Sequence, residues 1–448
     1  MASTYATFTN NTVPSTSKFT WSAWVKRGKL GTQQALFSGA QSSTTGQMIY
    51  FNGASDQLGF YGIASSTVRV DKYTTRKFRD VNAWYHIVVA YDSTLSTASD
   101  RVKFYVNGEL QQLNGTDVQV QGWEPYYMLT SPTDIGRDAM GTSSYFDGEI
   151  SHMNFVIGTV YDATAFGETD STTGEWKGKT SPSVTYGSDG FFILKDGNGI
   201  TDQSGEGNDF TLGGGTLTDL KDNPDNVFCT LSPLHKLGTN TGTYSNGNTK
   251  YADANSNWQG TMCTLGATSG KYYWEYQLVA GTYHMIGVMP DNVNLISSSV
   301  FDTIGGYSAY IDNGYIEARY NNADISGWSK SDLGNTSFST NDYINLAVDM
   351  DNKFMYIGKN GTWFKSGDPT SGSSGTGGIN VSATFTSGVF MIPVISAYNG
   401  TTGQFNFGNG YFGTTAVASA GTNASDNGIF EYDVPTGYTA LSTKGLNL

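Results

Sequence analysis

Two stretches of this chain, separated by roughly 250 residues, repeat one pattern of apolar and polar positions. Each stretch has an aromatic-led apolar strand, a short polar turn, a second alternating strand and then the dipeptide Asn-Gly. The first copy covers residues 84–92 and 101–108, and the second covers residues 343–349 and 353–361. The repeated order predicts the same local structure in both halves of the chain.

That local structure is a β-hairpin. Ile344, Leu346 and Val348 alternate with Asn345 and Asp349, which puts the apolar set on one buried face of a strand. Asn-Gly supplies the two positive-φ positions of a type I′ turn. One such unit in each half predicts an all-β protein with two antiparallel sandwiches in series, an architecture used more for recognition than for catalysis.

Further strand signals recur through both halves, with Gly, Asn and Asp between them, as a sandwich of meanders requires. They lie at residues 19–25, 48–51, 58–61, 66–70 and 145–155, then at 271–278, 284–288, 307–311, 315–320, 390–394 and 403–407. No stretch of ten residues shows a helical apolar stripe. We therefore expect little helix.

The pattern divides the chain into a first sandwich over residues 1–165, a Gly/Asp/Ser-rich connecting region over 166–232 and a second sandwich over 233–448. Residues 191–194 form an apolar strand that we expect to dock on a neighbouring sheet, because a free linker would expose its large side chains. The Ser/Gly-rich residues 366–378 look too polar to pack. They predict a mobile loop.

Charge excludes some partners. The formal net charge is −14, the pI is about 4.6, and the 25 Lys and Arg residues are scattered. Nucleic acids and anionic membranes need clustered cations, so neither is an expected partner. The N-terminal residues show no basic and apolar signal segment, and nowhere do 18 apolar residues run together. We expect neither standard secretion nor membrane insertion.

Cysteine and histidine offer little chemistry. Cys229 and Cys263 are the chain's two cysteines, and the sequence leaves open whether they form a disulfide or lie buried as free thiols. His86, His152 and His284 fall in strand patterns without a metal-ligand spacing, so we interpret them as structural. We expect no metal bound by Cys or His.

A catalytic carboxylate pair is also missing from the sequence. Some glucanases with a β-sandwich fold carry Glu-x-Asp-x-x-Glu on one strand, with the two Glu as nucleophile and acid/base. The nearest match begins at Glu168 and Asp170, but Thr173 stands where the second Glu is needed. No serine-nucleophile elbow, zinc-protease or phosphate-loop motif occurs. We expect a protein that is not an enzyme.

Two clusters of oxygen ligands are compatible with calcium, at residues 222–226 and 349–352. Ordinary turn chemistry explains both clusters better, so no metal site is assigned.

Some aromatic residues lie outside clean strand alternation, where sugars stack on exposed rings. The candidates for ligand binding are Trp123, Tyr126, Tyr127, Tyr320 and Trp328. Packing in a core or at a subunit interface is the alternative for each.

The first half resembles the laminin-G/concanavalin A-like sandwich family. The resemblance is carried, in order, by Phe19-Thr-Trp-Ser-Ala-Trp24, Trp84-Tyr-His-Ile-Val-Val-Ala90, Phe104-Tyr-Val-Asn-Gly108, Ile135-Gly-Arg137 and Phe146-Asp-Gly-Glu-Ile150. The second half resembles a SPRY-like sandwich through Ser269-Gly-Lys-Tyr-Tyr-Trp-Glu275, Met285-Ile-Gly287, Leu346-Ala-Val-Asp349 and Phe405-Asn-Phe-Gly408. Laminin-G-like folds often bind calcium at a rim, so the resemblance allows calcium without assigning its ligands.

The whole arrangement is similar to tandem-sandwich proteins of tailed, especially marine, bacteriophages. This resemblance implies a non-enzymatic virion protein, displayed as a fibre, spike or capsid appendage and assembled in the host cytoplasm. Its expected partners are other virion proteins, host-surface glycans and further copies of the chain in a homo-oligomer. A free or cell-surface carbohydrate-binding lectin is the alternative, followed by a glycan-cleaving enzyme.

Overall fold

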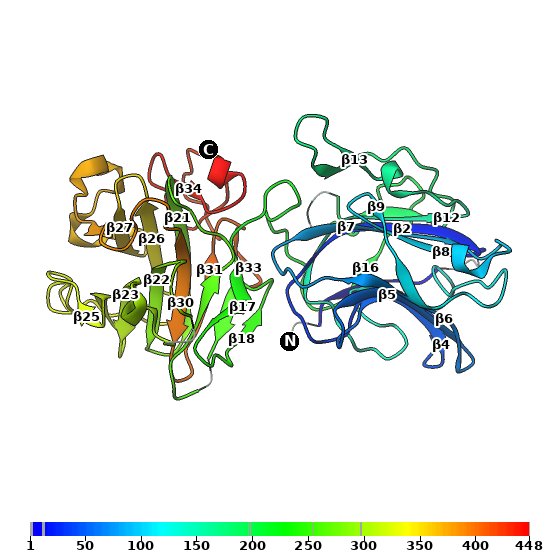
Figure 1. Ribbon diagram of the computed structural model, residues 1–448, viewed down its shortest axis with the longest axis horizontal. Coiled ribbons are helices and arrows are strands. Elements are labelled where there is room, and N and C mark those ends of the chain that lie inside the picture. Colours follow the sequence, from blue (N-terminus) through cyan, green and yellow to red (C-terminus); the bar gives the residue numbers. More distant parts are fainter. Residues whose placement is uncertain are drawn as a thin grey trace. The chain divides into compact units, whose positions relative to one another are not determined.

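The computed structural model describes residues 3–10, 14–195, 197, 199–253, 255–295 and 298–447. The chain forms two compact units, Met1–Asp219 and Leu220–Leu448 (Figure 1). The expected connecting region, residues 166–232, is thus shared between the two units. The described residues contain no α-helix. Their helical turns are short 3₁₀ segments: η1 (Ala98–Asp100), η2 (Ala163–Ala165), η3 (Phe301–Ile304), η4 (Phe364–Ser366), η5 (Pro369–Ser374) and η6 (Gly445–Asn447).

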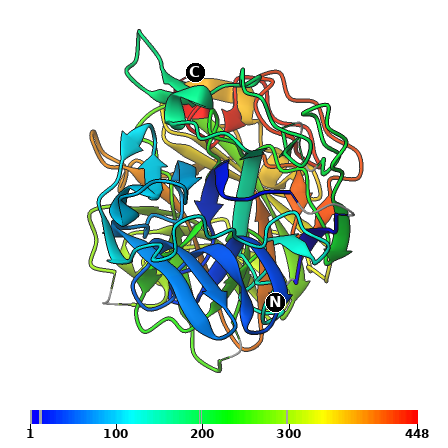
Figure 2. The same cartoon turned by 90° about the vertical axis from the view of Figure 1, so that its right-hand side faces the viewer.

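The first unit is a sandwich of two antiparallel sheets, which we name 1A and 1B (Figures 1 and 2). Sheet 1A has the order β10 (Leu113–Thr116), β6 (Thr67–Lys77), β5 (Gln57–Ala64), β4 (Thr45–Phe51), β3 (Gln34–Ser42), β11 (Thr133–Ile135), β1 (Tyr5–Phe8), β16 (Thr211–Gly214). Sheet 1B has the order β15 (Phe191–Ile193), β12 (Gly148–Ile157), β2 (Lys18–Arg27), β7 (Trp84–Asp92), β8 (Val102–Val106), β9 (Glu109–Leu110). The core between them contains Phe19, Trp21, Phe37, Phe60 and Tyr127.

Sheet 1B is also covered on its outer face. The hairpin of β13 (Gly167–Thr169) and β14 (Trp176–Gly178) lies on the side of this sheet away from sheet 1A (Figure 1). Phe166 joins Val88 and Val156 of the sheet in a second apolar cluster. Strand β2 is therefore buried on both faces from Phe19 onward, although its sequence alternates.

The second unit repeats this layering with sheets 2A and 2B. Sheet 2A has the order β17 (Leu231–Leu237), β20 (Gln259–Cys263), β30 (Met391–Ala397), β22 (His284–Pro290), β23 (Tyr307–Asp312), β24 (Tyr315–Tyr320), β25 (Ala323–Asp324). Sheet 2B has the order β18 (Thr243–Ser245), β19 (Lys250–Ala252), β31 (Thr402–Asn406), β21 (Lys271–Ala280), β26 (Tyr343–Asp349), β27 (Phe354–Lys359), β28 (Thr362–Trp363), with β29 (Ile379–Asn380) beside β27 and β34 (Thr439–Ala440) beside β21. A small hairpin, β32 (Tyr411–Phe412) and β33 (Thr415–Ala416), follows β31. Trp274, Tyr276 and Leu346 belong to the core of this unit.

The C-terminal residues cover the outer face of sheet 2B. Phe430, Val434 and Tyr438 pack there on Tyr273 and Tyr356 of the sheet. Both units thus have a third layer, made by a segment that follows most strands of the sheet it covers and precedes the last one, β15 or β34.

The two predicted Asn-Gly hairpins are confirmed. β7 pairs with β8, and β26 pairs with β27, both antiparallel. Asn107 and Gly108 have φ of 49° and 84°, and Asn360 and Gly361 have φ of 47° and 80°, as a type I′ turn requires. Each Asn side chain also accepts a backbone hydrogen bond at 2.8 Å, from His86 in one unit and Tyr343 in the other.

The prediction that residues 366–378 are too polar to pack is wrong. Pro369 and Gly375 are buried, and Asp368 caps η5 by accepting from the backbone N–H of Thr370. The hydroxyl of Tyr438 donates to the carbonyl of Pro369 at 3.0 Å. Hydrogen bonds from backbone groups and hydroxyls therefore hold this segment beside the ring of Tyr438, and Pro369 is its one apolar residue.

Candidate functional site

An open aromatic surface lies on the outer face of sheet 2A. One row of cross-strand partners runs Gly260, Ser396, Met285, Tyr310 and Glu317, so these five residues share that face. A separate apolar cluster containing Met285 and Tyr310 forms there, outside the main core. The outer face of sheet 2A therefore carries an apolar cluster of its own, on which further aromatic rings can pack.

Four aromatic rings, which we name the aromatic face, belong to this row or lie two residues along the chain from one of its members: Trp258, Tyr283, Tyr310 and Tyr398. Trp258 stacks on Tyr398 with ring centroids 5.5 Å apart and lies edge-on to Tyr310 at 5.6 Å. Tyr283 meets Tyr398 edge-on at 5.3 Å. Trp258, Tyr283 and Tyr398 are partly exposed, whereas Tyr310 is buried beneath them. The mutual contacts fix the rings in place while part of their surface stays open.

The loop between β22 and β23 also packs against this row. Ser396 donates from its hydroxyl to the carbonyl of Ser299 at 2.7 Å. Phe301 of η3 is fully buried in the cluster that contains Met285. This loop therefore bounds the aromatic face on one side.

Charged groups line the edge of the aromatic face. The hydroxyl of Tyr310 donates to Asp312 at 3.2 Å. Lys330 contacts Asp312 and lies 3.9 Å from a carboxylate oxygen of Glu317. Desolvation raises the pKa of the Glu317 carboxyl. Burial is the largest single influence on the Lys330 amine and lowers its pKa, but the hydrogen bond to Asp312 and the charges of Asp312, Glu317 and Asp324 together raise the pKa overall.

Arg319 connects the face to η3. Its guanidinium lies 5.2 Å from the ring centroid of Tyr310. Its Nε is 3.5 Å from Asp302 of η3 and 4.0 Å from Asp324. Asp302 is fully buried, and burial raises the pKa of its carboxyl. One arginine thus supports the central ring and holds the neighbouring loop.

Such a surface is chemically suited to polyhydroxylated ligands. An aromatic ring offers an apolar face to the C–H groups of a sugar, and ionised carboxylates accept hydrogen bonds from hydroxyls. Sequence reasoning missed Tyr310 because it falls in an alternating strand and was assigned to the core. Trp258, Tyr283 and Tyr398 lie just beyond the ends of strands and were not weighed as candidates. The parity of β23 was the available signal, since Tyr310 and Asp312 alternate with the core residues Ala309 and Ile311.

The ring candidates named from sequence lie elsewhere. Trp123 and Tyr127 are buried in the first core, and Tyr126 packs against it while partly exposed. Trp328 is buried in the second core, where Tyr320 stacks on Tyr307 with centroids 4.2 Å apart. Burial of Trp123, Tyr127 and Trp328 agrees with the core-packing alternative.

A smaller tyrosine surface lies on the outer face of sheet 1A. Met48 and Asp71 are both cross-strand partners of Tyr61, and Gly59 is the partner of Tyr73. Tyr61 and Tyr73 are partly exposed, and burial raises the pKa of the Asp71 carboxyl. No tryptophan belongs to this surface among the described residues. It provides a comparison site for the aromatic face.

His86 is a structural residue. The indole N–H of Trp176 donates to its Nδ1 at 3.0 Å, so the neutral ring carries its proton on Nε2, which contacts the hydroxyl of Ser22 at 2.9 Å. A ring in this tautomer cannot take a proton from Ser22. Burial lowers the pKa of His86 to about 3, with a smaller contribution from His152. The Ser-His contact is therefore not a nucleophile and its base.

His284 and the two cysteines are also buried, whereas His235 of β17 is exposed. His284 is fully buried and contacts the hydroxyl of Tyr276 at 2.8 Å. His152 is partly buried and contacts the hydroxyl of its neighbour Ser151 at 2.7 Å. Cys229 and Cys263 are buried free thiols. Burial and the neighbouring Cys229 raise the pKa of Cys263, which disfavours the reactive thiolate.

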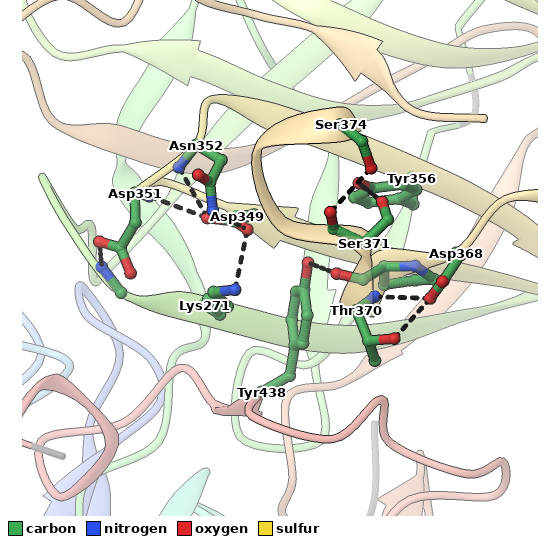
Figure 3. Close-up of polar contacts among 12 residues, drawn as sticks. Lys271, Asp349, Asp351, Asn352, Tyr356, Asp368, Thr370, Ser371, Ser374 and Tyr438 are labelled. Atoms are coloured by element: carbon green, nitrogen blue, oxygen red, sulfur yellow. Dashed lines mark hydrogen bonds and ion pairs between the residues drawn. The ribbon is translucent and has the colours of Figure 1, made fainter. Parts of the chain in front are cut away.

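Protein donors already fill the oxygen cluster at residues 349–352 (Figure 3). Asp349 is fully buried; one carboxylate oxygen accepts from the backbone N–H groups of Asp351 and Asn352. The other oxygen contacts Lys271 at 3.0 Å and accepts from the Asn352 amide at 2.8 Å. This arrangement is a buried, ion-paired turn.

The remaining motifs are turns as well. Asn223 accepts backbone hydrogen bonds from Asp225 and Asn226. Asp170 accepts from the N–H groups of Thr172 and Thr173. No group of three or more His, Cys, Asp or Glu side chains within the described ranges is placed to hold a metal ion.

The family comparison concerns the first unit. Residues 1–159 match the family model of the Concanavalin A-like lectin/glucanases superfamily. None of the curated proteins matches the chain. No helix in the described part of the chain is long and apolar enough to cross a membrane.

Three solved structures similar to the chain each match it with a low TM-score. The SPRY domain of human HERC1 is 16% identical, with 39% of this chain and 96% of that chain covered and a TM-score of 0.27. Domain 4 of the arabinanase AbnA from Geobacillus stearothermophilus, in complex with arabinotriose, is 21% identical, with 34% and 66% covered and a TM-score of 0.26. A heptameric pentraxin from Limulus polyphemus is 15% identical, with 34% and 69% covered and a TM-score of 0.26. TM-scores this low carry no information about ligands or activity.

Proposed function

We propose that this protein binds glycans through the aromatic face of its second unit and does not cleave them. The observation that carries the proposal is the group of three partly exposed rings, Trp258, Tyr283 and Tyr398, packed together beside Tyr310, whose hydroxyl donates to Asp312. The family match of the first unit, which joins lectins and glucanases, supports a carbohydrate ligand.

The position of Lys330 supports binding over cleavage. Asp312 and Glu317 are the carboxylates beside the rings, where a glycosidase would hold its nucleophile and its acid. Lys330 contacts both of them, and its ammonium lowers the nucleophilicity of Asp312. A glycan held here meets carboxylates that already have a cationic partner.

We further propose that the chain is displayed on the surface of a tailed-phage particle, as a fibre, spike or capsid appendage. The motif resemblance of both halves to tandem-sandwich virion proteins supports this setting. Its partners there are other virion proteins, further copies of the chain and host-surface glycans. Mass spectrometry of purified particles should find the chain in stoichiometric amount, and its absence from particles would leave the free lectin as the better description.

Glycan binding is tested with the full chain on an oligosaccharide array, followed by calorimetry with the best ligand. Trp258→Ala and Tyr398→Ala should each weaken binding at least tenfold, since central aromatic contacts cost more than about 1.4 kcal/mol when truncated. Tyr61→Ala on sheet 1A is the matched control and should bind like wild type. Thermal unfolding of each variant shows whether the second unit remains folded.

Two results would contradict the proposal. Binding that Tyr61→Ala abolishes and Trp258→Ala preserves would put the site in the first unit. New reducing ends after incubation with the bound glycan, lost in Asp312→Asn, would make the protein an enzyme.

A further inference from the structure

The charges around the aromatic face are arranged so that each cation lies between two carboxylates. Lys330 lies between Asp312 and Glu317. Arg319 lies between Asp302 and Asp324, at 3.5 and 4.0 Å. The four carboxylates exceed the two cations, so the local charge is negative when all six groups are ionised.

Neither cation is available to an acidic ligand without loss of its present partners. The Lys330 amine is tightly paired with Asp312, and its raised pKa reflects that pairing. Arg319 also donates to the side chain of Asn322 at 2.9 Å. Anionic sugars are normally held by Arg or Lys that can turn toward the carboxylate or sulfate. Here such a turn would leave carboxylates such as the fully buried Asp302 without a counter-charge.

The net charge of the chain also disfavours an acidic ligand. The chain carries a formal charge of −14, so an acidic polymer approaches against a repulsive field. Repulsion between like charges weakens the binding of an acidic glycan to this surface. The stacking contacts would have to offset that free-energy cost.

We infer that the glycan bound by the aromatic face is non-acidic, carrying neither carboxylate nor sulfate groups, and that the paired cations exclude acidic glycans. This inference rests on the proposed function and specifies its ligand class. The rings hold the apolar faces of the sugar, and the spare acceptor positions of Asp312 and Glu317 take hydrogen bonds from its hydroxyls.

The experiment compares array glycans that share a backbone and differ in uronic acid or sulfate groups. Wild type should bind the non-acidic member of each pair at least tenfold more tightly. The double variant Asp312→Asn/Glu317→Gln frees Lys330 and should gain at least tenfold in affinity for the acidic member, and added salt should abolish the gain. Asp100→Asn/Glu109→Gln, at exposed positions of the first unit, makes the same change in net charge and should gain little.

The outcomes separate the two proposals. Tight binding of an acidic glycan by wild type that Trp258→Ala abolishes would overturn the inference and leave the binding function standing. An equal gain in both double variants would overturn the role of the paired cations. Glycan binding that Trp258→Ala leaves unchanged would overturn the function of the face and the inference together.

Discussion

The ring of Trp176 lies directly against the α-carbon of Gly108. A β-carbon added at Gly108 would come within 2.6 Å of the indole, and the same holds for Gly361 and the ring of Tyr432 in the second unit. Each glycine is the second residue of the Asn-Gly turn. In both units, therefore, the turn that closes the repeated hairpin is also the seat of an aromatic residue from the covering layer.

Gly108→Ala and Gly361→Ala should each destabilise their own unit by about 2–4 kcal/mol, because positive φ and overpacking both penalise a β-carbon. Gly158→Ala and Gly327→Ala are the controls: φ is 81° and 79°, and nothing lies within 4 Å of the added carbon. These controls should cost about 1 kcal/mol. Urea unfolding followed by peptide-resolved hydrogen exchange measures each unit separately. Equal losses at the seats and at the controls would contradict a steric role for the rings.

Local patterns made the two hairpins predictable, because Asn-Gly and strict alternation determine a turn and two faces without long-range information. The covering layers were not predictable in this way. Trp24 and His86 alternate on the outer side of sheet 1B, yet both are buried. What buries them includes Trp176, from a hairpin in a region whose composition resembles a linker.

The residues of the candidate site were also not predictable from local sequence patterns. An aromatic residue next to the end of a strand has no sequence signature of the face on which it packs. Trp258, which directly precedes β20, was therefore not singled out, while Trp123 and Trp328 were singled out and are buried. Only the register that aligns Met285 with Tyr310 and Ser396 shows which rings share an open face.

Acid should destabilise the first unit through His86. Burial lowers the pKa of His86 from 6.5 to about 3. Below pH 6.5 the imidazole is therefore protonated in the unfolded chain but stays neutral in the folded chain. The contribution of His86 is present above pH 6.5 and is lost as pH falls, by up to about 1.4 kcal/mol per pH unit. His86→Gln should remove this slope. Urea midpoints of the first unit between pH 7.5 and 4.5 measure it, and parallel pH profiles would refute the assignment.

Glu275 should give the second unit the opposite pH dependence. This fully buried carboxylate accepts from the backbone N–H groups of Glu431 and Tyr432 at 2.9 and 2.8 Å. Burial raises its pKa from 4.5 to about 7, despite hydrogen bonds that lower it. The folded state then holds an extra proton between these values. The stability that this proton adds is present at low pH and is lost as pH rises through 7, by about 3 kcal/mol in total.

Glu275→Gln removes that proton and also mismatches one backbone N–H. The variant should therefore lose more stability at pH 5 than at pH 8, measured as the difference in urea midpoint of the second unit. Hydrogen exchange of residues 428–436 should rise in the variant. A loss of stability that is constant with pH would show that Glu275 is ionised throughout.

The Lys271–Asp349 ion pair should stabilise the second unit without a metal. Lys271→Met leaves Asp349 buried without its cation and should cost about 3–5 kcal/mol. Lys177→Met, at the partly exposed pair with Asp170, is the control and should cost much less. Calcium or EDTA should leave the Tm of wild type unchanged in calorimetry. A rise in Tm with calcium that changes in Lys271→Met would instead indicate a calcium site at residues 349–352.

The covering layers also set an order of events during synthesis. Trp176 follows its seat at Gly108 by about 70 residues, and Tyr432 follows Gly361 by a similar distance. A ribosome that adds about 5–20 residues per second leaves each seat uncovered for roughly 4–14 seconds. During that interval one side of each new sheet, with Val88 in the first unit and Tyr273 in the second, has no covering layer of its own. Chaperone contact with nascent chains should therefore peak twice, each time just before a covering segment emerges.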